Sequence, residues 1–223
     1  RSLRSHIWKF VIRKIYKKHM SVAEIRAQDA SAAKFAGPPP KDVQIERVNI
    51  DGIDAAWIRP SGAERTKTLL HIHGGGYVTG SIPSYLRMCI LMAQMLNINV
   101  LLPAYRLAPE HPFPAAMEDV LKIYRRLLND GFQPKDIFIS GDSAGGGLCV
   151  AAVIALRDQK EALPAAVLCM SPWVDLTMQG QSHVTNPKSE AMLNAGTLRE
   201  WALLYTNEKN FGSPLVSPIF ADF

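Results

Sequence analysis

Residues 141–148 read Gly-Asp-Ser-Ala-Gly-Gly-Gly-Leu, a G-x-S-x-G pentapeptide between two apolar runs. The first run, 137–139, is typical of a buried strand, and the second, 148–156, of a buried helix. Small residues let strand and helix approach closely at a tight turn, and a serine there presents its Oγ above the sheet. The segment predicts a nucleophile elbow with Ser143 as the nucleophile. Taken alone, the pentapeptide also fits a glycine-rich strand-to-helix loop.

A second glycine-rich segment lies upstream. His73 is followed by three glycines and Tyr77, directly after the strand-like run 68–72. Consecutive glycines let a backbone come close to a reacting oxygen, so that its N–H groups can stabilise the oxyanion of an acyl transfer. We expect Gly75 and Gly76 to be such donors, together with the N–H of Ala144. A phosphate-binding loop is the alternative, but neither of the usual glycine patterns for phosphate occurs here.

Three segments carry a family resemblance. They are His-Gly-Gly-Gly at 73–76, Tyr-Arg-Leu-Ala-Pro-Glu-His-Pro-Phe-Pro-Ala-Ala at 105–116 and Gly-Asp-Ser-Ala-Gly-Gly at 141–146. In this order they resemble the hormone-sensitive lipase family of α/β-hydrolases, which includes many microbial carboxylesterases and lipases. The resemblance implies Ser143 as the nucleophile and an oxyanion hole beside it. The implied site residues are Gly75, Gly76 and Ala144 as oxyanion donors, and His73 and Gly74 as structural residues of the oxyanion loop.

Beyond residue 40 the sequence alternates between strand-like and helix-like stretches. Strands at 43–50 and 53–58 flank Asp51-Gly52, a hairpin turn signal. The other expected elements are strands at 68–72, 99–103, 136–140 and 165–170, and helices at 84–97, 115–129 and from 144 onward. Strands separated by helices predict a parallel sheet covered on both faces. We therefore predict an α/β-hydrolase fold with a mostly parallel sheet, helices on both faces and a helical cap.

Residues 1–19 are basic and amphipathic. Arginines and lysines alternate there with apolar residues such as Trp8 and Phe10, and no acidic residue precedes Glu24. Such a helix can lie on a membrane or on insoluble substrate. The family resemblance implies a different role, in N-terminal helices of a cap over the active site. Proline at 38–40 ends the helical segment, so we assign residues 1–40 to cap helices.

The segment 176–206 breaks the alternation of strands and helices, with polar turns followed by a helical pattern. The resemblance implies a cap insertion here, between the core segments 41–175 and 207–223. Side chains of such an insertion are candidate walls for the acyl or alcohol group of a substrate. The candidates for the substrate pocket are Tyr77, Met192, Leu193, Trp201 and Tyr205. The alternative for each is that it packs the insertion onto the core.

A serine hydrolase of this fold needs an acid and then a histidine after the nucleophile. The only histidine after Ser143 is His183, and Asp175 precedes it in the correct order. Their spacing argues against this pair, because a helical crossover between parallel strands takes at least about ten residues. We expect both catalytic partners, and the C-terminal part of the fold, to lie outside residues 1–223. Asp142 adjoins the nucleophile, but an elbow directs its side chain away from Oγ, so we expect it to make structural hydrogen bonds.

Composition and charge restrict the other possibilities. The chain of 223 residues has a net charge of +5, and most of the positive charge lies in the N-terminal helix, without a nucleic-acid-binding motif. No apolar stretch reaches the length of a transmembrane helix, and no signal-peptide pattern opens the chain. Three cysteines within apolar runs fit a reducing compartment, so we expect a cytoplasmic protein. We expect neither a metal nor a cofactor. The sequence leaves open whether the protein forms a homodimer.

Together these observations predict a serine carboxylesterase that hydrolyses short- to medium-chain carboxylic esters through an acyl-enzyme on Ser143. Its partner is a small-molecule ester. One alternative is a non-catalytic binding protein of the hydrolase fold, as in the plant gibberellin receptor, which resembles this family but lacks the catalytic histidine. An amidase or deacetylase with the same machinery is another. An intact elbow and oxyanion loop favour an enzyme, because a binding protein needs neither.

Overall fold

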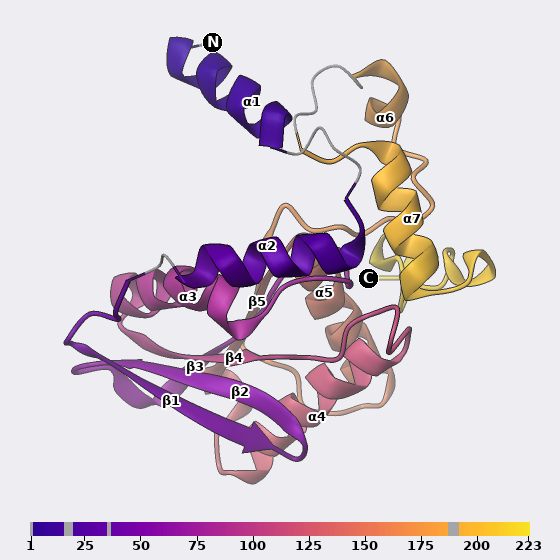
Figure 1. The fold of residues 1–223 in the computed structure, drawn as a ribbon. Helices are drawn as coiled ribbons and strands as arrows, with labels where there is room; N and C mark the ends of the chain where they lie inside the picture. Colours follow the sequence, from indigo (N-terminus) through magenta and orange to yellow (C-terminus); the bar gives the residue numbers. More distant parts are fainter. Residues whose placement is uncertain (1, 16–19, 35–36, 187–191) are drawn as a thin grey trace.

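The computed structural model describes residues 2–15, 20–34, 37–186 and 192–223. Within these residues a six-stranded sheet has the strand order β1-β2-β4-β3-β5-β6. Helices lie on both sides of the sheet (Figure 1). Two further helices precede it in the chain, α1 (Leu3–Ile15) and α2 (Val22–Lys34). The α/β architecture predicted from the sequence is confirmed.

The first two strands form the predicted hairpin. β1 (Val43–Ile50) and β2 (Ile53–Pro60) run antiparallel, and their pairing ends at the turn of Asp51 and Gly52. These two residues have φ angles of 51° and 92°. A type I′ turn requires positive φ at both central positions, which is why Asp-Gly suits it. β2 also pairs antiparallel with β4, so the hairpin forms the antiparallel edge of the sheet.

The other four strands are parallel, as predicted. They are β3 (Glu64–Ile72), β4 (Ile98–Pro103), β5 (Ile137–Asp142) and β6 (Ala166–Met170). Every residue of β4 is buried, as expected for a strand covered on both faces. The ends of β3 and β5 lie side by side, because Ile72 pairs with Gly141. The two glycine-rich segments that follow these strands therefore meet at the carboxyl edge of the sheet, where ligands bind in open α/β sheets.

Two apolar clusters cover the two faces of the sheet. α3 (Ile82–Leu96) packs on one face, whereas α4 (Ala115–Asn129) and α5 (Ser143–Asp158) pack on the other. Val100 belongs to the α3 cluster and the next residue, Leu101, to the α4 and α5 cluster. Successive side chains of a strand point to opposite faces, so one strand supplies both cores. The three helices predicted in the core are confirmed.

Beyond β6 the described chain forms short helices and turns. α6 (Ser182–Thr185) and α7 (Ala195–Tyr205) lie in the segment predicted as an insertion. Short 3-10 helices occupy Pro134–Asp136, Glu208–Asn210 and Pro218–Phe220. The last of these returns to the core, since the N–H of Ile219 donates to the Val174 carbonyl. β6 is the edge strand of the described sheet, and the Leu168 side chain there is 52% exposed.

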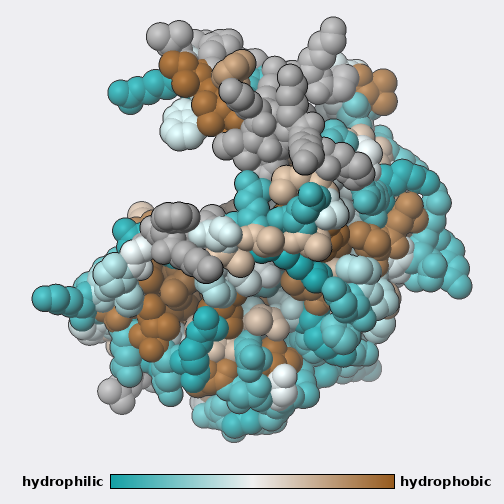
Figure 2. Space-filling view, in the orientation of Figure 1, coloured by the Kyte–Doolittle hydropathy of each residue, from teal (hydrophilic) through white to brown (hydrophobic). Residues whose placement is uncertain are grey.

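α1 stands away from the sheet (Figure 1). Its apolar side chains form a brown patch that projects beyond the body of the molecule (Figure 2). On this helix the Trp8 side chain is 64% and the Phe10 side chain is 70% exposed. None of the described helices is long and apolar enough to cross a membrane.

Candidate active site

Ser143 lies at the sharp turn where β5 ends and α5 begins. Its φ of 51° falls in the left-handed region, which costs a residue with a side chain about 1–3 kcal/mol. Close packing holds this turn. A Cβ on Gly145 would lie 2.1 Å from the carbonyl oxygen of Ile72, so α5 directly touches the end of β3. This is the strand-turn-helix geometry that the sequence predicts for Ser143.

Two peptide units in the loop after β3 are fixed through their carbonyl oxygens. The carbonyl of Gly74 accepts a 2.8 Å hydrogen bond from Nδ1 of His73. The carbonyl of Gly75 accepts hydrogen bonds of 3.0 and 2.9 Å from the N–H groups of residues 78 and 79. In a planar trans peptide the C=O and the following N–H point in opposite directions. The N–H groups of Gly75 and Gly76 are therefore turned away from these partners.

Glycine is required at position 75. The residue has a φ of 116°, which L side chains rarely adopt, and a Cβ there would lie 2.3 Å from the Thr79 carbonyl oxygen. Any side chain would therefore open the turn that orients the N–H of Gly76.

Three backbone N–H groups near Ser143 have no hydrogen-bond partner among the described residues. They belong to Gly75, Gly76 and Ala144. Ala144 lies in the first turn of α5, where N–H groups lack an acceptor within the helix. Gly75, Gly76 and Ser143 line one cavity. An unpaired backbone donor is costly unless water or a ligand accepts its hydrogen bond, so this arrangement suits an oxygen that carries negative charge.

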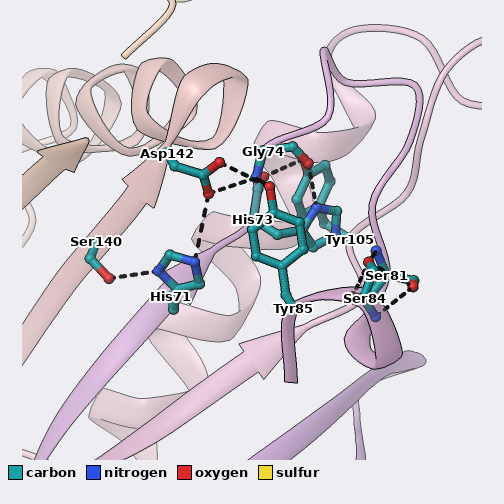
Figure 3. Close-up of polar contacts among 9 residues, drawn as sticks. All are labelled: His71, His73, Gly74, Ser81, Ser84, Tyr85, Tyr105, Ser140 and Asp142. Carbon is teal, nitrogen blue, oxygen red and sulfur yellow. Dashed lines mark hydrogen bonds and ion pairs between the residues drawn. The ribbon is translucent and has the colours of Figure 1, made fainter. Parts of the chain in front are cut away.

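Asp142 holds the two glycine-rich segments together (Figure 3). Its Oδ1 accepts a 3.0 Å hydrogen bond from the N–H of Gly74, and its Oδ2 accepts a 2.9 Å hydrogen bond from the hydroxyl of Tyr85. The same hydroxyl accepts a 3.1 Å hydrogen bond from the N–H of Gly74. On the other side of the loop, the Tyr105 hydroxyl donates to the His73 carbonyl at 2.8 Å. Asp142 thus has the structural role that the sequence predicts.

The two histidines of this region are buried and neutral. Burial lowers the pKa of His71 to about 4, and burial likewise lowers the pKa of His73 to about 4. His71 Nδ1 lies 2.9 Å from Ser140 Oγ, whereas its Nε2 lies 3.7 Å from Asp142 Oδ1, beyond hydrogen-bond distance. With a neutral imidazole this second contact is not an ion pair. The His73 ring stacks on Tyr105 with centroids 4.3 Å apart.

A cavity of about 750 Å³ opens above Ser143. Its lining comes from α2, the loop after β3, α3, the elbow and the segment 192–201. The lining residues are Met20, Ile25, Asp29, Gly75, Gly76, Thr79, Gly80, Ser84, Tyr85, Asp142, Ser143, Met192, Leu193, Asn194, Gly196, Thr197, Leu198, Glu200 and Trp201. Trp201 lies directly against the oxyanion loop, because a Cβ on Gly76 would be 2.1 Å from its ring.

The structure separates the five predicted pocket residues into two groups. Met192, Leu193 and Trp201 line the cavity. Tyr77 and Tyr205 do not line it. Their rings stack with centroids 3.8 Å apart, and their exposed fractions are 2% and 1%. Aromatic rings bury much apolar area, and this pair instead joins α7 to the core.

Comparison with known proteins agrees with this geometry. Residues 69–223 match the family described as alpha/beta hydrolase fold. An esterase of the bacterial hormone-sensitive lipase family has a crystal structure that superposes with a TM-score of 0.91 at 39% identity, over 99% of this chain and 74% of its own. The chain belongs to the bacterial hormone-sensitive lipase family of α/β-hydrolases. The resemblance and the fold predicted from the sequence are both confirmed.

Curated relatives in this family cover most of the chain. An acetyl-hydrolase from Streptomyces hygroscopicus is 41% identical over 201 residues, which are 90% of this chain and 65% of the relative. An esterase from Acinetobacter venetianus is 36% identical over 186 residues, 83% of this chain and 61% of the relative. The chain therefore spans slightly less than two thirds of the length of either relative.

None of the described histidines hydrogen-bonds to Ser143 Oγ. His183 lies on α6 and does not line the cavity, and neither does Asp175. Asp175 instead accepts hydrogen bonds from the N–H and the hydroxyl of Thr177. The structure therefore does not bring these two residues together with the elbow, in agreement with the spacing.

Sequence reasoning missed three residues that the structure places at the site. Tyr85 comes from the first turn of α3, and Ile25 and Asp29 come from α2. The assignment of residues 1–40 to cap helices placed α2 over the active site, but it did not indicate which of its side chains face the cavity. For Tyr85 the sequence offered no signal, because its hydroxyl partner Asp142 lies far along the chain.

Proposed function

We propose that the full-length protein is a serine carboxylesterase in which Ser143 Oγ attacks the carbonyl carbon of an ester. One observation carries the proposal: the unpaired N–H groups of Gly75, Gly76 and Ala144 lie beside a strained serine at the end of β5. The names of the relatives from Streptomyces hygroscopicus and Acinetobacter venetianus, an acetyl-hydrolase and an esterase, support the same reaction class.

In the first half of the reaction the Oγ–carbon bond forms and the carbonyl oxygen becomes an oxyanion. The three N–H groups donate hydrogen bonds to it, and each such donor contributes about 10²–10³ in rate. A histidine base accepts the Oγ proton and passes it to the departing alcohol, which leaves an acyl group on Ser143. Water then attacks the acyl-enzyme with the same assistance, releases the carboxylic acid and restores Ser143.

We further propose that short- to medium-chain acyl groups suit this site. The cavity measures about 750 Å³, and the Trp201 ring packs on Gly76 beside the donors. α2 and the segment 192–201 close over the elbow from two sides, as cap elements would. These walls bound the space beside Ser143, which favours a short acyl chain over a long one.

The decisive experiment compares the full-length protein with its Ser143→Ala variant on p-nitrophenyl acetate and p-nitrophenyl butyrate. We expect the variant to lose at least about 10⁴-fold in kcat while retaining its melting temperature. Ser61→Ala, at an exposed position, serves as the control and should retain activity. A phosphonate inhibitor should label Ser143 in the wild type, as detected by peptide mass spectrometry. Activity retained by Ser143→Ala would refute the nucleophile, and tight ester binding without turnover by the wild type would indicate a binding protein.

A further inference from the structure

α2 contacts the oxyanion loop through two side chains that lie one helical turn apart. Thr79 Oγ1 donates a 3.2 Å hydrogen bond to Asp29 Oδ2. Arg26 Nε donates a 2.7 Å hydrogen bond to the carbonyl of Val78. α2 also packs on α3, beside which it lies above the sheet (Figure 1). The loop that presents Gly75 and Gly76 is thus held from outside by a helix from the start of the chain.

Arg26 also binds the segment 105–116, which contains one of the three motifs found in the sequence. Its Nη2 donates to the Ala108 carbonyl at 2.8 Å. Its guanidinium pairs with both oxygens of Glu110, Nη1 with Oε1 at 2.8 Å and Nη2 with Oε2 at 2.9 Å. These hydrogen bonds lower the pKa of Glu110 to about 2, so the carboxylate stays charged and holds the guanidinium in one orientation.

The ion pair alone does not explain this arrangement. The Arg26 and Glu110 side chains are 33% and 54% exposed, and exposed ion pairs typically contribute about 0.2–1 kcal/mol. The more informative contacts are the two hydrogen bonds to backbone carbonyls in different segments. They place the guanidinium between the oxyanion loop and the segment 105–116, which also meet where the N–H of Ala108 donates to the carbonyl of Tyr77.

A chain of hydrogen-bonded peptide units leads from Arg26 to the site. The carbonyl of Val78 and the N–H of Thr79 belong to one peptide unit, and that N–H donates to the Gly75 carbonyl at 2.9 Å. The Gly75 carbonyl and the N–H of Gly76 belong to the next unit, and this last N–H is one of the three unpaired donors. Hydrogen-bonded dipoles polarise one another, so a positive charge at the first carbonyl strengthens the last donor.

We propose that Arg26 is a positioning residue for the oxyanion hole: it orients and polarises the peptide chain that ends at the N–H of Gly76. The inference rests on the proposed function, because it assigns Gly76 a charged oxygen to stabilise. Arg26 itself does not touch the reacting atoms. Arg26 thereby couples the position of α2 to the geometry of the oxyanion donors.

The test uses Arg26→Gln and Arg26→Lys in the full-length protein. Glutamine removes the positive charge and the pair of hydrogen bonds to Glu110. We expect kcat on p-nitrophenyl acetate to fall about tenfold while KM changes less than about twofold. Lysine restores the charge but cannot reach both carbonyls and Glu110 with one nitrogen, so it should recover only part of kcat. Arg125→Gln is the matched control. Arg125 forms a comparable pair of hydrogen bonds with both oxygens of Glu161, away from the cavity. Removing its guanidinium should therefore leave kcat unchanged.

Amide hydrogen exchange of residues 74–80, followed by mass spectrometry, gives a second readout that needs no catalysis. Exchange should accelerate in Arg26→Gln and stay unchanged in Arg125→Gln, since only the first releases the loop. Unchanged exchange in Arg26→Gln would overturn the proposal. So would a raised KM with an unchanged kcat, because α2 would then act only as a wall of the pocket. If the wild type hydrolysed no ester, the proposed function would fail, and the exchange experiment would still decide whether Arg26 holds the loop.

Discussion

The elbow and its oxyanion loop differ from the helical segments above them in how they are held. Beside Ser143, hydrogen bonds from the side chains of Asp142, His73 and Tyr105 fix the backbone of the oxyanion loop at residues 73 and 74. The segments above reach this region from outside: α2 does so through the side chains of Arg26 and Asp29, whereas Trp8 and Phe10 on α1 are largely exposed. Substrate preference is thus expected to depend on the segments above the elbow, and the rate on the fixed region together with Arg26, through which α2 reaches the oxyanion loop.

The largest expected effect comes from opening the fixed region itself. In Gly75→Ala the new Cβ would lie 2.3 Å from the Thr79 carbonyl oxygen, at a φ of 116°. Because the turn that orients the Gly76 donor must open, we expect kcat/KM for p-nitrophenyl acetate to fall at least about 100-fold. The measurement is steady-state kinetics on the full-length protein.

Gly212→Ala is the control for this prediction, because a Cβ there meets nothing within 4 Å. It should retain wild-type kinetics. If Gly75→Ala retained more than half of the wild-type kcat/KM, the loop would not be as rigidly fixed as its hydrogen bonds indicate, and the contrast between the two regions would collapse.

The difference between these regions also explains what the sequence could predict. β4 carries the apolar run Val100-Leu101-Leu102, and Asp51-Gly52 marks a turn by its own chemistry, so local patterns predict the sheet and its hairpin. The elbow and the glycine loop were equally readable, because the backbone there demands small residues in consecutive positions. In such places the cause of the structure lies within a few residues of the sequence.

The walls of the cavity could not be predicted in this way. Tyr205 and Trp201 lie on the same helix and have similar chemistry, yet one stacks in the core on Tyr77 while the other covers Gly76. Which of them faces the cavity depends on how α7 packs, and no local pattern encodes that. Arg26 and Asp29 likewise reach partners far along the chain, so only the folded structure brings them to the site.

The next effect concerns the two buried histidines of the fixed region. Burial lowers the pKa of His71 and of His73 to about 4, whereas an unfolded histidine titrates near 6.5. Between these values the unfolded chain binds more protons than the folded one. Their contribution to stability is therefore complete above about pH 6.5 and is lost as the pH falls toward 4, on the order of a few kcal/mol in total.

Denaturant unfolding of the wild type and of His71→Gln, measured between pH 4 and 7.5, checks this prediction. The free energy of unfolding of the variant should fall less steeply with decreasing pH, because one of the two groups is gone. Parallel curves for the two proteins would show that His71 titrates normally in the folded state and is not fixed as a neutral ring.

A smaller effect is expected where one anchor of the fixed region is removed and another remains. Tyr85→Phe deletes the hydroxyl that donates to Asp142, at a cost of about 1–3 kcal/mol in the free energy of unfolding. Asp142 still accepts from the N–H of Gly74, so kcat should fall less than about tenfold. Tyr124→Phe is the matched variant, since its hydroxyl donates to the Ala162 carbonyl away from the site. It should lose stability without losing kcat, and an equal loss of kcat in both would deny Tyr85 a specific role.

The smallest effect should come from the exposed helix at the start of the chain. Trp8 is 64% exposed on α1, so Trp8→Ala removes little buried area and should change the free energy of unfolding by less than about 0.5 kcal/mol. Ile25→Ala, on α2, alters a residue that lines the cavity and should change KM for butyrate esters while kcat stays within about twofold. Thermal melts and steady-state kinetics on both variants test the contrast within the N-terminal segment itself. A clear loss of stability in Trp8→Ala would mean that α1 packs on the protein in solution, and that the N-terminal segment acts as one unit with the core.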